Sequence, residues 1–275
     1  MRTSLNLGPY LSLCLSLCCS TFSVFAAQTT PVLSHAAKPA AWQSSIYISQ
    51  AFNEVALKNE YDKARHRIRK WRIPVRVFIE HQVGDRALHT QLVQMQLTHL
   101  AEITGHDMQL VDTLADANLH LVFTRQSLWA SEVTRLMGVK SAQNVHGSVC
   151  MGKFALNSKS EIERAWVIIP VDQAQMHGKL VACVVEEITQ VLGLPNDSEK
   201  VFPSIFNDKT PQDLLTGLDF ILLKLLYNPS ILAGMTAAEV KSPVQFLLKQ
   251  WQSDGTIEHA DKIVRQGQLY PLLGY

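Results

Sequence analysis

The chain carries no excess of charge of either sign, since 25 Lys and Arg are balanced by 24 Asp and Glu among its 275 residues. This balance leaves no whole-protein field to attract nucleic acid or an anionic membrane. Internal repeats and low-complexity tracts are also missing, which excludes solenoid and disordered classes. Hydrophobic residues make up 47% of the sequence and charged residues 18%. That composition predicts one substantial globular domain with no nucleic-acid partner.

Long apolar runs are scarce in the sequence, and one of them lies at the N-terminus. There a positively charged residue precedes a stretch dense in Leu, Ser and Cys, which predicts a signal peptide over residues 1–26 with cleavage before Ala27. The run is short for a membrane span, and a lipoprotein signal at Cys18 is the less favoured alternative because a bulky leucine precedes it. We therefore expect a periplasmic or secreted protein without an integral membrane span, starting with a linker over 27–44.

Cysteine is rare as well. Of five cysteines, Cys14, Cys18 and Cys19 belong to the predicted signal peptide, which leaves Cys150 and Cys183. An even number in an oxidising compartment favours a disulfide, and a closed loop of this length contributes roughly 3–4 kcal/mol on the chain-entropy estimate. Two separate buried thiols are the alternative, because free cysteine is itself common in protein cores.

Hydrophobic periodicity predicts an α+β fold with helices packed on one sheet. We expect helices over 46–71, 87–104, 179–192, 210–227, 237–251 and 257–264, and strands over 76–81, 108–111, 117–124 and 165–170. The segment 125–160 is punctuated by glycine and is predicted to be irregular. The basic stretch 64–72, ARHRIRKWR, is interpreted as the solvated face of a charged helix, with an anionic docking patch as the alternative.

Histidine is missing where a known catalytic pattern would need it. The stretch VVEEITQVLGLPND, residues 184–197, has the spacing of the zinc-protease helix H-E-x-x-H-x-x-G-x-x-H without its histidines. The ligand positions hold Glu186, Gln190 and Asn196, while Glu187 stands at the catalytic position and Gly193 at the turn. On a helix Glu186 and Gln190 share one face, and a turn at the glycine brings Asn196 near them.

Three segments carry a resemblance to known families: VEEITQVLGLPND, then VFPSIFND at 201–208, then LTGLDFILLKLLYN at 215–228. Together they resemble the helix, the methionine turn and the last helix of matrixin-like metzincin proteases, with Ile205 in place of the methionine. Over about residues 70–235 the chain more closely resembles the bacterial domain-of-unknown-function family 2927. The resemblance implies a metzincin-like zincin domain.

That domain is expected to hold a small twisted sheet with packed helices. Its predicted bounds are 45–235, including an N-terminal helix, and a C-terminal helical extension follows over 236–275.

The departures from the protease pattern change the expected chemistry. Side-chain amides are poor zinc ligands, so no zinc and no other cofactor is expected at Glu186, Gln190 and Asn196. One interpretation is a hydrogen-bonded polar network in place of the metal. The other is a site for a hard cation such as calcium, with Asp197 and Asp208 adding oxygen ligands.

Two loop histidines, His146 and His177, flank the site helix in sequence, and each is more typical of a surface residue than of a site residue. No Ser-His-Asp order or phosphate-binding glycine loop is present.

The expected function is that of an exported pseudo-metalloprotease, which binds a peptide or protein partner in a zinc-less cleft beside an edge strand at 165–170. Enzyme activity is not expected on this interpretation. The alternative is a metal-dependent, peptidase-like hydrolase that uses Glu187 with a non-zinc ion. A purely structural component of the cell envelope is the third interpretation.

Overall fold

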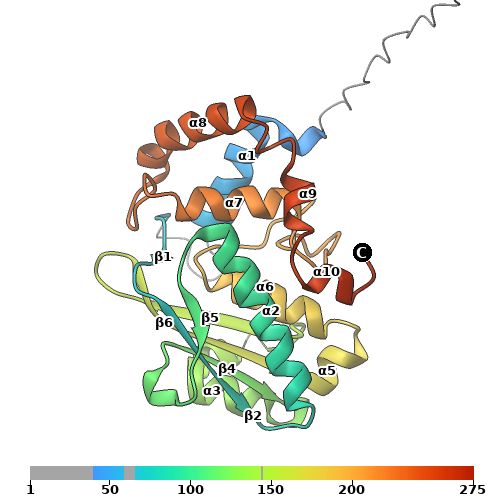
Figure 1. The fold of residues 1–275 in the computed structure, drawn as a ribbon. Coiled ribbons are helices and arrows are strands. Elements are labelled where there is room, and N and C mark those ends of the chain that lie inside the picture. The colour runs from blue at the N-terminus through green and yellow to red at the C-terminus, as the bar shows by residue number, and fades with distance from the viewer. Residues whose placement is uncertain (1–39, 59–65, 144) are drawn as a thin grey trace, which may run out of the picture. The chain divides into compact units, whose positions relative to one another are not determined.

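A mixed sheet lies at the centre of the computed structural model, which describes residues 40–58, 66–143 and 145–275 (Figure 1). Its strand order is β1-β6-β4-β2-β3, with β5 paired to β6. The strands are β1 (Lys70–Trp71), β2 (Val75–His81), β3 (Met108–Leu110), β4 (Leu119–Thr124), β5 (Met151–Leu156) and β6 (Glu161–Pro170). All pairs are parallel except the antiparallel pair of β5 with β6. The predicted α+β class is thereby confirmed.

Helices cover both faces of the sheet. Side chains alternate between the two faces along each strand, so apolar residues on both faces need a covering layer. Val122 of β4 and Ile168 of β6 pack against α3 (Trp129–Met137) on one face. On the other face, the sheet packs against α2 (Arg86–Thr104) and α6 (Leu180–Gln190). A parallel sheet buried on both sides accounts for the nearly unbroken apolar runs of β4 and β6.

The remaining helices are α1 (Ser45–Phe52), which continues as a π-helical turn over Asn53–Leu57, α4 (Val139–Ala142), α5 (Val171–Met176), α7 (Gly217–Tyr227), α8 (Ala237–Ser253), α9 (Ala260–Val264) and α10 (Leu269–Leu272). Helices α1, α7 and α8 lie together at one end of the sheet (Figure 1), whereas α4 packs on α3 and α5 packs on α6. Three short 3₁₀ turns cover Ala41–Gln43, Leu114–Asp116 and Gln126–Leu128. Helix α8 packs on α1, and α9 packs on α7.

The described part of the basic stretch, residues 66–72, is not the solvated helix face that its charge predicted. The first helical segment ends at Leu57, and Lys70 belongs to strand β1. Lys70 is 3% exposed, and its Nζ donates hydrogen bonds to the carbonyls of Leu226 at 2.8 Å and Ile231 at 2.7 Å. Burial, followed by the charge of Arg72, lowers the pKa of Lys70 to about 8. This lysine therefore fastens the strand to the end of α7.

Two further predictions about the sheet were wrong. The segment 125–160 is regular in part, since it contains α3 and strand β5. The stretch 165–170 is not an edge strand, because β6 lies between β4 and β5. The edge beside the site helix is therefore formed by β5. An amphipathic antiparallel strand with one half-exposed face has a weaker apolar signal than the central strands.

The predicted signal peptide over 1–26 and most of the predicted linker lie outside the described residues. Within the described part of the chain, no helix combines the length and apolar character needed to cross a membrane.

Candidate functional site

A cleft of about 1070 Å³ lies between strand β5 and helix α6. Its lining comes from the segment 147–154, from the exposed face of α6, and from the chain between 195 and 212. A disulfide joins Cys150, just before β5, to Cys183 on α6, with an S–S distance of 2.02 Å. The predicted pairing is thus confirmed, and it connects two walls of the cleft covalently.

Helix α6 presents its polar residues to the cleft as the i, i+4 spacing predicts. Glu186 and Gln190 both line the cleft, and so does Glu187, which is 5% exposed. Strand β5 passes close to Glu187 at Gly152, where an added Cβ would lie 2.8 Å from Glu187 Oε2. A residue with a side chain at 152 would displace the carboxylate of Glu187, so glycine here leaves room for that carboxylate in its observed position.

The chain turns sharply after α6 at Gly193, which has a φ of 119°. A Cβ at this position would clash with the carbonyl of Arg69, so only glycine fits. The chain then returns toward the helix, and the backbone N–H of Ser198 donates to the carbonyl of Phe206 at 2.8 Å. Gly193 is thus the residue at which the chain turns back after α6.

The turn brings Asp197, not Asn196, into the cleft. Gln190 Nε2 donates to Asp197 Oδ1 at 2.8 Å, whereas Asn196 Nδ2 donates to the backbone carbonyl of Asp197 at 2.9 Å. Asn196 is buried and is not among the residues that line the cleft. The expectation that Asn196 would face Glu186 and Gln190 is therefore wrong, and the aspartate one position later takes its place.

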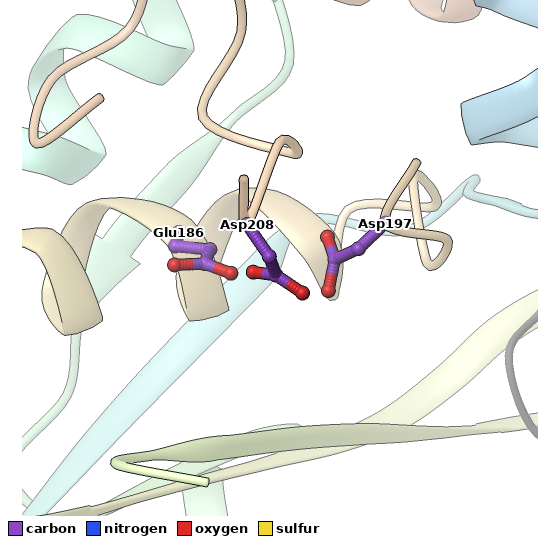
Figure 2. Close-up of side chains that lie close together, drawn as sticks. All are labelled: Glu186, Asp197 and Asp208. Atoms are coloured by element: carbon purple, nitrogen blue, oxygen red, sulfur yellow. The ribbon is translucent and has the colours of Figure 1, made fainter. Parts of the chain in front are cut away.

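Three carboxyl groups converge on the floor of the cleft: those of Glu186, Asp197 and Asp208 (Figure 2). One oxygen from each lies within 4.8 Å of the others. Burial, followed by the charges of Glu187, Asp197 and Asp208, raises the pKa of Glu186 well above its ordinary value. The nearby ammonium group of Lys179 forms an ion pair with Asp213 at 2.7 Å. Among the described residues, this cluster offers the side chains close enough to share one metal ion.

A residue that the sequence interpretation missed holds the loop that carries Asp208. Asp219, fully buried in α7, accepts hydrogen bonds from Ser204 Oγ at 2.5 Å and from the backbone N–H of Ile205 at 3.1 Å. It also accepts from the N–H of Thr216 at 2.7 Å and from its hydroxyl at 2.9 Å. The spacing of Thr216 and Asp219 is that of a capping box, which was the available sequence signal.

The donor set at the predicted ligand positions does not fit zinc. Gln190 and Asn196 both use their amide nitrogens as hydrogen-bond donors to Asp197, and neither amide is a good zinc ligand. Glu186 alone cannot replace three imidazoles. The polar network predicted here exists in part, with Asp197 rather than Glu186 as the acceptor for Gln190.

The two loop histidines take no part in this site. His146 and His177 are both exposed, and neither lines the cleft.

Comparison with known proteins yields one match. A family model described as "Protein of unknown function (DUF2927)" matches residues 45–245. No curated protein and no solved structure matches the chain. The family match covers more than half of the chain and includes β5, α6, the turn at Gly193 and the carboxyl cluster. This chain therefore belongs to the DUF2927 family.

Proposed function

We propose that this protein is exported, has a metzincin-like fold, and binds an extended polypeptide in the cleft between β5 and α6 without cleaving it. Support for the fold comes from the site helix, from the glycine turn that ends it, and from the loop 201–208 that returns beneath the same face. Support for export comes from the N-terminal signal pattern and from the Cys150–Cys183 disulfide, which suits an oxidising compartment.

The observation that carries the binding proposal is the position of β5. Among the described strands, β5 pairs only with β6, so its outer edge is not used by another strand. Residues 151–154 on this strand line the cleft. An open strand edge presents alternating N–H and C=O groups, and an extended peptide satisfies them by adding a strand to the sheet.

Cleavage is not proposed because the groups that would activate water are incomplete. Glu187 lines the cleft, and its place in the sequence pattern is that of the catalytic glutamate of a zinc protease. Without a metal the pKa of water is not lowered toward neutrality, and a single carboxylate generates little hydroxide from it. The amides of Gln190 and Asn196 do not supply the missing zinc ligands.

Strand addition is tested with fluorescent peptides of mixed sequence, about ten residues long, whose backbone is N-methylated at alternate positions or at every position. Methylation at alternate positions should leave binding intact, because one edge of the peptide keeps its N–H groups, and methylation at every position should abolish binding. Amide hydrogen exchange should slow in β5 and stay unchanged in β3, which lies at the opposite edge of the sheet. Binding that survives methylation at every position, or hydrogen exchange that slows in neither strand, would refute the proposal.

A second candidate, a metal-dependent hydrolase with Glu187 as general base, is favoured by one observation, the carboxyl cluster beside Glu187. The same peptides distinguish the two functions when they are recovered after incubation with the protein and weighed by mass spectrometry. Intact peptides support binding alone. Cleavage that stops on addition of a chelator, and in Glu187→Gln, would establish the hydrolase.

A further inference from the structure

We propose that Glu186, Asp197 and Asp208 bind a calcium ion on the floor of the cleft. This inference does not rest on the proposed function, because an ion at this position stabilises the fold whether or not a polypeptide enters the cleft. The three ligands come from three separate parts of the chain: helix α6, the turn after Gly193, and the loop 201–208. An ion shared among them would hold these parts together.

The spacing of the oxygens suits calcium without movement of the chain. Oxygen ligands lie about 2.3–2.6 Å from calcium, so two ligands on opposite sides of one ion are up to about 5 Å apart. The oxygens of Glu186, Asp197 and Asp208 lie within 4.8 Å of one another. Magnesium demands stricter octahedral geometry at about 2.0–2.1 Å and gives up its waters reluctantly, so it suits this set of protein ligands less well.

Glu186 provides the second, independent observation. Its carboxyl group is enclosed by protein atoms on most sides and points toward the other two carboxyl groups (Figure 2). Among the described residues it has no hydrogen-bond or ion-pair partner, although buried polar groups in proteins nearly always have one. The ammonium of Lys179, which is close enough to influence Glu186, is paired with Asp213 instead. A cation bound here would neutralise the three carboxyl groups together.

The chemistry of the ligands selects a hard ion. All three donors are carboxylate oxygens, the ligand type that calcium prefers, and no imidazole or thiolate is present in the cluster. Gln190 donates to Asp197 Oδ1 and thereby orients the second ligand. Three protein carboxylates fall short of the six to eight oxygens that calcium takes, so we expect weak affinity, with a Kd of about 0.1–1 mM.

The proposal is tested by thermal unfolding of the purified protein after removal of metals with a chelator. Calcium chloride at about 10 mM should raise Tm by roughly 3–8 °C, because an ion bound only to the folded state shifts the unfolding equilibrium. Magnesium at the same concentration should raise it less. Asp208→Asn should reduce the calcium affinity at least about tenfold, and its side chain is exposed, so the fold should be retained.

Two more variants complete the test. Glu186→Gln should also abolish the calcium-dependent rise, whereas Glu199→Gln is the matched control, since it removes an exposed carboxylate from the neighbouring loop and should leave the rise unchanged. The proposal is overturned if calcium produces no rise, or if the rise persists undiminished in Asp208→Asn and Glu186→Gln. The proposal would also be overturned if magnesium or zinc raised Tm as much as calcium does, or more. A rise caused by a lysine-rich peptide and not by calcium would overturn it as well, since that would make the cluster a site for a basic side chain.

Discussion

Two carboxyl groups with raised pKa values, Asp219 and Glu186, differ in what surrounds them. Burial is the first cause that raises the pKa of each, to about 6 for Asp219 and well above the ordinary value for Glu186. Asp219 accepts four hydrogen bonds, two from Thr216 and two from the Ser204–Ile205 segment, and these oppose the shift. Within the described part of the chain Glu186 accepts no hydrogen bond, and the charges of Glu187, Asp197 and Asp208 raise its pKa further.

The comparison separates a structural carboxylate from a binding one. A buried charge whose acceptor capacity is filled by protein donors contributes to stability and leaves no room for a ligand. A similar charge without donors destabilises the folded chain unless something from solution neutralises it. Asp219 and Glu186 are connected through one loop, because Asp219 holds Ser204 and Ile205, and the same loop carries Asp208 to Glu186.

The largest effect is expected from removing the structural carboxylate. Asp219→Ala leaves the hydroxyl of Ser204 and the N–H groups of Ile205 and Thr216 buried without their acceptor. We expect the free energy of unfolding to fall by about 3–5 kcal/mol, measured by urea denaturation. Calcium affinity should fall as well, because the loop that carries Asp208 loses its anchor.

Asp116→Ala is the control for that measurement, since Asp116 is an exposed aspartate that accepts a single hydrogen bond from Thr113. Its cost should stay within about 0.5 kcal/mol. A comparable loss of stability in both variants would mean that the buried network around Asp219 has no special role.

A buried base extends the comparison to the opposite charge. His99 on α2 is 6% exposed, lies against Gly267 of the C-terminal segment, and packs edge-on against Tyr270. Burial lowers the pKa of His99 to about 4, although a hydrogen bond with the backbone of Val264 opposes the shift. At pH values above the ordinary pKa of histidine, the ring is neutral in both the folded and the unfolded chain. The contribution of buried His99 to the free energy of unfolding is therefore fully present in that pH range. As the pH falls toward about 4, the unfolded chain takes up a proton that the folded chain refuses, and stability is lost.

The predicted loss from His99 alone is about 2–3 kcal/mol between about pH 7 and about pH 4.5. It is measured as the difference in unfolding free energy between the natural protein and His99→Gln, because other buried histidines add their own pH dependence to both. As the pH falls, the natural protein should lose more unfolding free energy than His99→Gln does. His259→Gln, at an exposed histidine, serves as the control substitution.

Local patterns in the sequence predicted the parts of this fold that depend on neighbouring residues. The spacing of Leu92, Val93, Leu97 and Leu100 predicted α2, and Gly105, with a φ of 68°, ends it as expected. Gly193 was identified as the turn from its place after a helix. The disulfide followed from the count of cysteines, because only two remain after the predicted signal peptide.

The features that the sequence interpretation missed depend on contacts between distant segments. The charges around Lys70 predicted a basic helical face. Its burial depends instead on the carbonyls of Leu226 and Ile231, more than 150 positions away, which accept its hydrogen bonds. Strand β5 is defined by its pairing with β6, and its sequence alone has no strong period. The path of the backbone after Gly193 decides that Asp197, and not Asn196, enters the cleft. Helical spacing does not determine this path.

The smallest expected effect on the free energy of unfolding is that of Glu186→Gln in the absence of calcium. It is a gain of stability, whereas Asp219→Ala is expected to cause a loss. Glu186→Gln removes a charge that faces Asp197 and Asp208 and keeps the size of the side chain. In a chelator at about pH 8, the free energy of unfolding should therefore rise by up to about 1 kcal/mol, since loss of like-charge repulsion outweighs the loss of a group that has no donor to satisfy it. Glu163→Gln, an exposed carboxylate on β6 that does not line the cleft, controls for the change in net charge. A substantial destabilisation by Glu186→Gln under these conditions would place Glu186 with Asp219 among the structural carboxylates, and the distinction between the two groups would then fail.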